Sequence, residues 1–251
     1  MKQVLRQFLT SLRFLTIIPI SWLSENDSEH FPGSVKYFGL VGLTIGVFGS
    51  LISLVLSTFL PYPILCCALL LYLSLISGFL HLDGIADTAD GFFSSRPKEK
   101  ILTIMRDSRT GAMGVIVLIF LFLFKFCALF SLPADKLIVV VFFMPLAGRC
   151  AIVYTMSFLP YARANGGLGK MFYSNDKNGA LWLTSFIFLI SGIFVNVSLA
   201  VIIFGVLLLV VALFGVWCKR IIGGITGDTL GAVCEITETT VAVVLSIFFN
   251  L

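Results

Sequence analysis

The chain has 251 residues, of which 59% are hydrophobic and only 12% are charged, and its formal net charge is +4. Soluble domains carry about 25% charged residues, so this composition excludes a soluble globular protein and indicates a helical membrane protein. The apolar runs are continuous rather than alternating, which argues against a transmembrane β-barrel. We treat residues 1–251 as one membrane domain.

The first predicted element, residues 4–20, is an amphipathic helix at the membrane interface. Arg6 and Arg13 interrupt its apolar residues, so the segment is poorly suited to crossing a bilayer. No small-residue cleavage site follows it, and we therefore do not expect a signal peptide.

Seven apolar segments follow, each close to the roughly 20 residues that a membrane-spanning helix needs. They are residues 35–60, 62–80, 111–132, 137–159, 180–195, 199–217 and 229–251. The predicted fold is therefore an all-α, polytopic transmembrane helical bundle of about seven spans.

The basic residues predict the orientation. Seven spans place the N-terminus and residues 82–110, 160–179 and 219–228 on one side of the membrane. Of the 17 lysines and arginines, Lys125 and Arg149 lie within spans, Lys136 lies on the opposite side, and the other 14 lie on this side. The positive-inside rule makes this side cytoplasmic and the C-terminus external. A basic face suits anionic lipid and phosphorylated substrates, and no nucleic-acid partner is expected.

The motif HLDGIADTADGFFSSR, residues 81–96, follows the second apolar segment. At roughly 100° per helical residue, Asp83, Asp87 and Asp90 share one narrow face. Three neighbouring carboxylates repel one another and are costly to desolvate, and a divalent cation would offset both effects. Oxygen ligands without His or Cys favour Mg²⁺ or Mn²⁺ over zinc. We predict a Mg²⁺ site here, with a solvated helix end as the alternative.

A second acidic motif, GGITGDTLGAVCEITE, covers residues 223–238. Glu235 and Glu238 lie inside an otherwise apolar segment, where a carboxylate must face a wet cavity or a partner. We predict that Asp228, Glu235 and Glu238 complete the same metal site, the alternative being that the two glutamates pair with Arg149 elsewhere. The candidate catalytic residues are Asp87, Asp90, Asp228 and Glu235.

Two further motifs, RDSRTGAMG and YARANGGLGKMF, supply groups that suit phosphate. A guanidinium binds phosphate oxygens through two parallel hydrogen bonds, and the backbone N–H groups of Gly166, Gly167 and Gly169 could meet an anion. For the glycine-rich loop, a plain flexible connection is equally compatible. The candidate substrate-binding residues are Arg106, Asp107, Arg109, Arg149, Arg163, Gly167 and Gly169.

Acids for a metal and arginines for phosphate on one membrane face predict Mg²⁺-dependent transfer chemistry on a diphosphate. A carboxylate would accept the proton of an attacking hydroxyl. The residues themselves do not specify the substrate.

The four motifs, in this order and together with FLTIIPI near the N-terminus, resemble the cobalamin synthase family, the adenosylcobinamide-GDP ribazoletransferases. The resemblance covers most of the chain. It implies a Mg²⁺-dependent integral enzyme of the cell inner membrane. In that family a hydroxyl of α-ribazole, or of its 5′-phosphate, displaces GMP from adenosylcobinamide-GDP, giving adenosylcobalamin or its 5′-phosphate.

Two other classes remain open. A CDP-alcohol phosphotransferase also uses membrane-embedded acids and Mg²⁺, but Asp87 stands where the arginine of its D-G-x-x-A-R signature is expected. An ion-coupled transporter would use Glu235, Glu238 and Arg149 and would move its substrate without bond cleavage.

Overall fold

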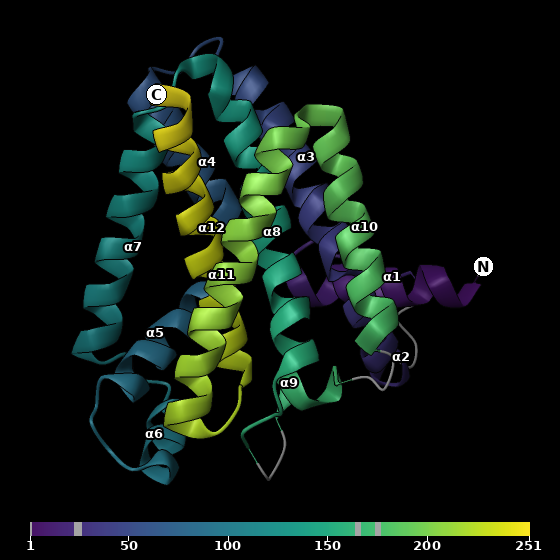
Figure 1. Ribbon diagram of the computed structural model, residues 1–251, viewed down its shortest axis with the longest axis vertical. Coiled ribbons are helices and arrows are strands. Elements are labelled where there is room, and N and C mark those ends of the chain that lie inside the picture. Colours follow the sequence, from purple (N-terminus) through teal and green to yellow (C-terminus); the bar gives the residue numbers. More distant parts are fainter. Residues whose placement is uncertain (1, 23–26, 164–166, 174–176) are drawn as a thin grey trace.

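The computed structural model describes residues 2–22, 27–163, 167–173 and 177–251 (Figure 1). Within these ranges the chain is helical, and an isolated backbone bridge between Tyr161 and Ile225 is the sole β-type pairing. The elements are α1 (Lys2–Leu15), α2 (Asp27–Ser34), η1 (Val35–Tyr37), α3 (Phe38–Leu56), α4 (Tyr62–Ile76), α5 (Leu80–Phe92), α6 (Lys98–Ile104), α7 (Ala112–Phe130), η2 (Ala134–Lys136), α8 (Leu137–Phe158), α9 (Leu168–Met171), α10 (Lys177–Val195), α11 (Val197–Ile222) and α12 (Gly227–Asn250).

The predicted all-α membrane bundle is confirmed, and all seven predicted apolar segments are helical. Five helical stretches are long and apolar enough to cross a bilayer by themselves: Ser28–Leu56, Ala112–Phe130, Ala134–Phe158, Val197–Ile222 and Gly227–Asn250. Helix α4 meets this criterion only together with α5, and α10 is a shorter apolar helix. By length and composition, five of the described helical stretches can cross a membrane, or six if α4 and α5 count as one bent span, and α10 adds a shorter apolar helix to the predicted set of about seven.

Helix α8 forms the centre of the bundle, and most of its side chains are buried. Helix α3 packs against it through glycines. A Cβ atom on Gly42 would lie 2.6 Å from the carbonyl oxygen of Pro145, and one on Gly46 would lie 2.4 Å from the carbonyl oxygen of Phe142. Helices in lipid gain their association from such close backbone contact, so these glycines fix α3 against the core helix.

A sharp bend separates α4 from α5. The two helices are inclined by 86°, and the break contains two consecutive left-handed residues, Gly78 (φ +58°) and Phe79 (φ +60°). The segment after α1 packs against this bend, where the N–H of Ile17 donates to the carbonyl oxygen of Ile76 at 2.8 Å. The sequence predicts a single span over residues 62–80, directly followed by the aspartates. The bend instead gives the aspartates a helix of their own.

The polar segments gather at one end of the bundle. In Figure 1, α6, α9 and the connection between α11 and α12 lie at the bottom, whereas the C-terminus lies at the top. Helix α1 runs across the spanning helices rather than along them, as an interfacial helix would. Its inner face contacts the bundle, where the hydroxyl of Ser11 donates to the carbonyl oxygen of Ser34 at 2.7 Å.

Candidate active site

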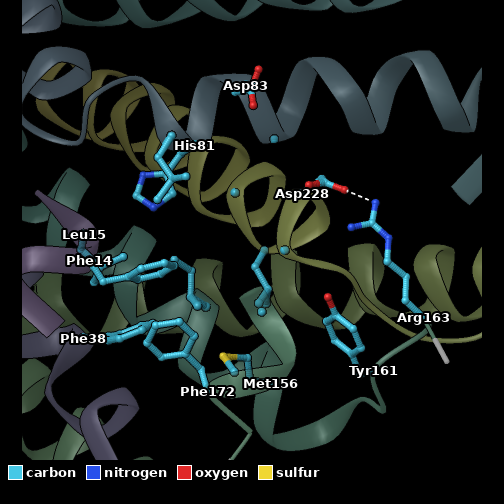
Figure 2. Close-up of a pocket in the computed structure, with 17 residues that line it drawn as sticks. Phe14, Leu15, Phe38, His81, Asp83, Met156, Tyr161, Arg163, Phe172 and Asp228 are labelled. Atoms are coloured by element: carbon cyan, nitrogen blue, oxygen red, sulfur yellow. Dashed lines mark hydrogen bonds and ion pairs between the residues drawn. The ribbon is translucent and has the colours of Figure 1, made fainter. Parts of the chain in front are cut away.

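A cavity of about 230 Å³ opens at the polar end of the bundle (Figure 2). Its walls come from α1, α3, α5, α8 and α12, and from Tyr161, Arg163, Gly169 and Phe172. One side carries Asp83, Asp228 and Arg163, and the other side carries aromatic rings. The cavity therefore joins a charged end to an apolar end.

Two glycines bring the acidic motifs together. A Cβ atom on Gly84 would lie 2.7 Å from the carbonyl oxygen of Asp228, and one on Gly231 would lie 3.1 Å from the Cα of His81. No larger residue fits at either position without moving a backbone. Helices α5 and α12 can therefore touch, and Asp228 lies beside the aspartates of α5 although far from them in sequence.

Arg163 forms an ion pair with Asp228, with Nη2 donating to Oδ2 at 2.6 Å. The loop that carries Arg163 is tied to the start of α12, because the N–H of Ala162 donates to the carbonyl oxygen of Ile225 at 2.8 Å. Helix α12 itself begins with a capping box between Thr226 and Thr229. The arginine is thus placed by backbone pairing, which a loop connection alone would not achieve.

The carboxylate of Asp87 is surrounded by like charges. Asp83, Asp228 and Asp90 repel it, and Arg163 attracts it. This surplus of negative charge is the electrostatic condition under which a bound cation is stabilising.

Asp90 has a further role that was not predicted from the sequence. Both of its carboxylate oxygens accept backbone hydrogen bonds at the start of α7, from Gly111 N–H at 2.6 Å and from Gly114 N–H at 2.9 Å. A negative charge at a helix N-terminus is favourable, because it satisfies free N–H groups and the helix dipole. Asp90 therefore anchors α7 to α5.

Within the described ranges, no three His, Cys, Asp or Glu side chains are already grouped to hold one metal ion. Mg²⁺ usually keeps several waters and takes one or two protein carboxylates together with substrate phosphates. Asp83 and Asp228, which both line the cavity, provide such a pair, and Asp87 lies in the same acidic field. This donor set, oxygen only and net negative, fits Mg²⁺.

The predicted arginines after α6 lie on the surface. The guanidinium of Arg109 is 87% exposed and binds Asp107 twice, at 3.0 and 2.7 Å, and this pairing lowers the pKa of Asp107 to about 2. Arg106 is also exposed. Among the described residues that line the cavity, none comes from this loop, and Arg163 is the guanidinium that reaches it.

The glycine-rich loop contacts the cavity in part. Gly169 lines it, and a Cβ atom there would lie 3.2 Å from the backbone nitrogen of Gly227. Gly167 has φ +142°, and a Cβ atom there would lie 2.7 Å from the hydroxyl oxygen of Tyr161. Gly166 lies outside the described residues. The described glycines therefore allow close packing around the cavity.

Glu235 and Glu238 belong to a second, buried cluster. Lys125 of α7 donates to Glu235 at 2.6 Å and to Glu238 at 3.0 Å, and Arg149 of α8 pairs with Glu238. All four side chains are 5% exposed or less. Two cations balance two anions, so the structure has the arrangement of the alternative in which the glutamates pair with Arg149, extended by Lys125.

His81 connects the two clusters. Its imidazole lines the cavity, and its Nδ1 lies 3.5 Å from Nη2 of Arg149. Neither His81 nor Lys125 is among the site residues predicted from the sequence. The sequence does show Lys125 inside an apolar segment, and an ionisable residue in a membrane span is by default a candidate for function. His81 stood in a quoted motif, but its neighbour Arg149 is 68 residues away.

Fold and site together define a polytopic helical membrane protein with an acidic, arginine-bearing cavity at one end of its bundle. The sequence matches the family model described as cobalamin-5-phosphate synthase over residues 7–246, and the chain belongs to that family.

Curated relatives support this assignment across the chain. A protein of Clostridium botulinum (strain 657 / Type Ba4) is 37% identical over 98% of this chain and 99% of its own length, and is named adenosylcobinamide-GDP ribazoletransferase. Proteins of Clostridium novyi and Alkaliphilus oremlandii with the same name are each 35% identical, over 93% and 94% of this chain and 94% of their own lengths. No solved structure matches the chain.

Proposed function

We propose that the protein is a transferase that joins adenosylcobinamide-GDP to α-ribazole, or to α-ribazole 5′-phosphate, and releases GMP. The supporting observation is the cavity in which Asp83 and Asp228, from two separate motifs, meet beside Arg163. Relatives matched over nearly the whole chain carry the corresponding name. The products are adenosylcobalamin or its 5′-phosphate.

The chemistry requires one bond to form and one to break. A ribose hydroxyl oxygen attacks the phosphorus on the cobinamide side of the diphosphate, the bond to the second phosphate breaks, and GMP leaves. A carboxylate takes the hydroxyl proton, either Asp83 or Asp228 of the cavity or the neighbouring Asp87. Arg163 is placed to hold a diphosphate oxygen, because its planar guanidinium can serve Asp228 and a phosphate together.

Mg²⁺ is the proposed cofactor, held by Asp83 and Asp228 with Asp87 close by. When bound, it would neutralise the charge that develops on the phosphate oxygens of the leaving GMP. Asp90 adds negative charge near the site, while its two carboxylate oxygens accept hydrogen bonds from the start of α7.

We further propose that this end of the bundle faces the cytoplasm, in the inner membrane. The 14 basic residues assigned to that side support this orientation. Both substrates, which carry phosphate or ribose groups, would then reach the cavity without crossing the membrane.

The test is a GMP-release assay with the full chain in proteoliposomes. Adenosylcobinamide-GDP, α-ribazole and Mg²⁺ should give GMP and the joined product in equal amounts, and omission of α-ribazole should abolish both. Substrate accumulation inside vesicles without bond cleavage would favour a transporter. The buried cluster gives that class little support, since its four side chains are closed off and charge-balanced.

A further inference from the structure

The side of the cavity opposite Asp228 and Arg163 is an aromatic pocket. Phe172 lies with its ring centroid 4.2 Å from Phe14, 4.7 Å from Phe31 and 5.7 Å from Phe38. Phe14, Phe38 and Phe172 face the cavity, opposite Asp228 and Arg163 (Figure 2). Such rings favour a flat, apolar heteroaromatic ligand, which can pack against them in stacked or edge-on geometry.

The volume of the cavity limits what can enter it. Sites that enclose a drug-sized ligand usually measure about 300–1,000 Å³. A cavity of about 230 Å³ is smaller than this range. It has room for a bicyclic base, whereas a corrin macrocycle must remain outside it. The nucleoside is therefore the substrate whose ring system suits this space.

His81, which also lines the cavity, supplies one hydrogen-bond donor beside the aromatic pocket. A guanidinium can only donate hydrogen bonds, so the Nδ1 of His81 must accept from Arg149. With Nδ1 accepting, the hydrogen of the imidazole is on Nε2. Among the described residues, Nε2 has no hydrogen-bond partner although it is buried. A buried N–H without a partner is costly, and a bound acceptor would satisfy it.

We propose that this cavity binds the base of a benzimidazole nucleoside, with His81 donating from Nε2 to the unsubstituted ring nitrogen of the base. The inference rests on the proposed function and identifies which substrate occupies the cavity. A 5,6-dimethylbenzimidazole base has two apolar methyl groups, no N–H donor and one free ring nitrogen that accepts. Its hydrogen-bonding capacity matches one donor in an aromatic pocket.

The same observations disfavour the guanine of the other substrate. Guanine carries several donors and acceptors, which would require several polar partners in the pocket to offset their desolvation. With the base beside Phe172, the ribose extends toward Asp83 and Asp228. The nucleophile thus occupies the cavity, and the cobinamide diphosphate approaches its rim from outside.

A matched pair of nucleosides tests this proposal. α-Ribazole is compared with the corresponding 5,6-dimethylindole riboside, in which the accepting ring nitrogen is replaced by C–H. Equilibrium dialysis of the full chain against each nucleoside, without adenosylcobinamide-GDP, measures binding independently of turnover. For the wild type, we expect the indole riboside to bind on the order of tenfold more weakly, because one hydrogen bond to a buried donor is lost.

Two variants identify the donor. His81→Leu removes it, so the two nucleosides should bind that variant equally. Thr88→Val is the control, because Thr88 lies on the same helix but faces a separate apolar groove between α5, α7, α11 and α12. This variant should keep the tenfold preference.

Each outcome decides the proposal. Equal binding of both nucleosides to the wild type, or a preference that persists in His81→Leu, would overturn it, and so would a failure of α-ribazole to bind at all. The wild-type comparison decides even if His81→Leu does not fold. Binding with the expected preference but without GMP release would leave this inference standing and would refute the proposed function instead.

Discussion

The two charged clusters of this protein use similar residues in opposite ways. At and beside the cavity, three aspartates are offset by one arginine, Arg163, and remain partly exposed; Asp83 and Asp228 line the cavity, and Asp87 is their neighbour. In the core, Glu235 and Glu238 face two cations and are sealed from solvent. An acidic residue in a membrane protein therefore indicates a function only when its partners are known. A balanced set serves the fold, whereas a surplus of one charge leaves room for a ligand.

The largest effect is expected from unbalancing the buried cluster. Lys125→Met leaves two adjacent buried glutamates with one cation, and removal of one partner from a buried ion pair typically costs about 3–5 kcal/mol. The thermal unfolding temperature in detergent should fall strongly, and the double variant K125M/E235Q should recover part of the loss. Lys136→Met is the control, because Lys136 pairs with Asp135 on the surface and should change stability by less than about 0.5 kcal/mol. An unchanged unfolding temperature for Lys125→Met would contradict the ion-cluster interpretation.

A smaller stability effect, but a large activity effect, is expected at the cavity. Asp228→Asn should lower GMP release by about 10²-fold or more, because a carboxylate that binds metal or accepts the proton is lost. Mg²⁺ at ten times its dissociation constant should stabilise the wild type by about 1.4 kcal/mol. Differential scanning fluorimetry should show this stabilisation in the wild type and much less of it in Asp83→Asn and Asp228→Asn. Equal Mg²⁺ stabilisation in all three proteins would rule out a metal site between α5 and α12.

The smallest expected effect is a change in substrate affinity, and it distinguishes Arg163 from Arg109. Arg163→Lys keeps the charge but loses the planar fork, so the KM for adenosylcobinamide-GDP should rise roughly tenfold. Arg109→Lys should change it less than about twofold, because the exposed pair with Asp107 contributes little. The sequence-based prediction that Arg109 binds phosphate leads to the reverse ranking. Steady-state kinetics with both variants decides between the two.

Local features of this fold could be predicted from the sequence, because they depend on short-range patterns. The apolar segments, the interfacial α1 and the shared face of Asp83, Asp87 and Asp90 follow from helical periodicity alone. The bend before α5 does not, because it is formed by Gly78 and Phe79 in left-handed conformations without a proline to mark it.

Contacts between residues that are far apart in the sequence could not be predicted from it. The pairing of Lys125 with Glu235 joins positions 110 residues apart, and Asp90 caps a helix that begins more than 20 residues later. Asp228 was predicted to meet the α5 aspartates, and the structure brings them together through Gly84 and Gly231. The predicted grouping of Glu235 and Glu238 with them did not anticipate the two buried cations that hold these glutamates in the core.

The buried ion cluster also bears on how the chain is made. Lys125 enters the membrane with α7, whereas its partner Glu235 is synthesised 110 residues later. A lysine at the centre of a helix costs about 2.5–3.5 kcal/mol on insertion scales, which is an upper bound for Lys125 because it lies five residues before the end of α7. Helix α7 must carry this cost until α12 arrives. The very apolar flanks of Lys125, from Val115 to Leu123, offset it during that interval. Final assembly is therefore coupled to the insertion of α12, and a ribosome that stalls before Glu235 would leave α7 as an unpaired substrate for membrane quality control.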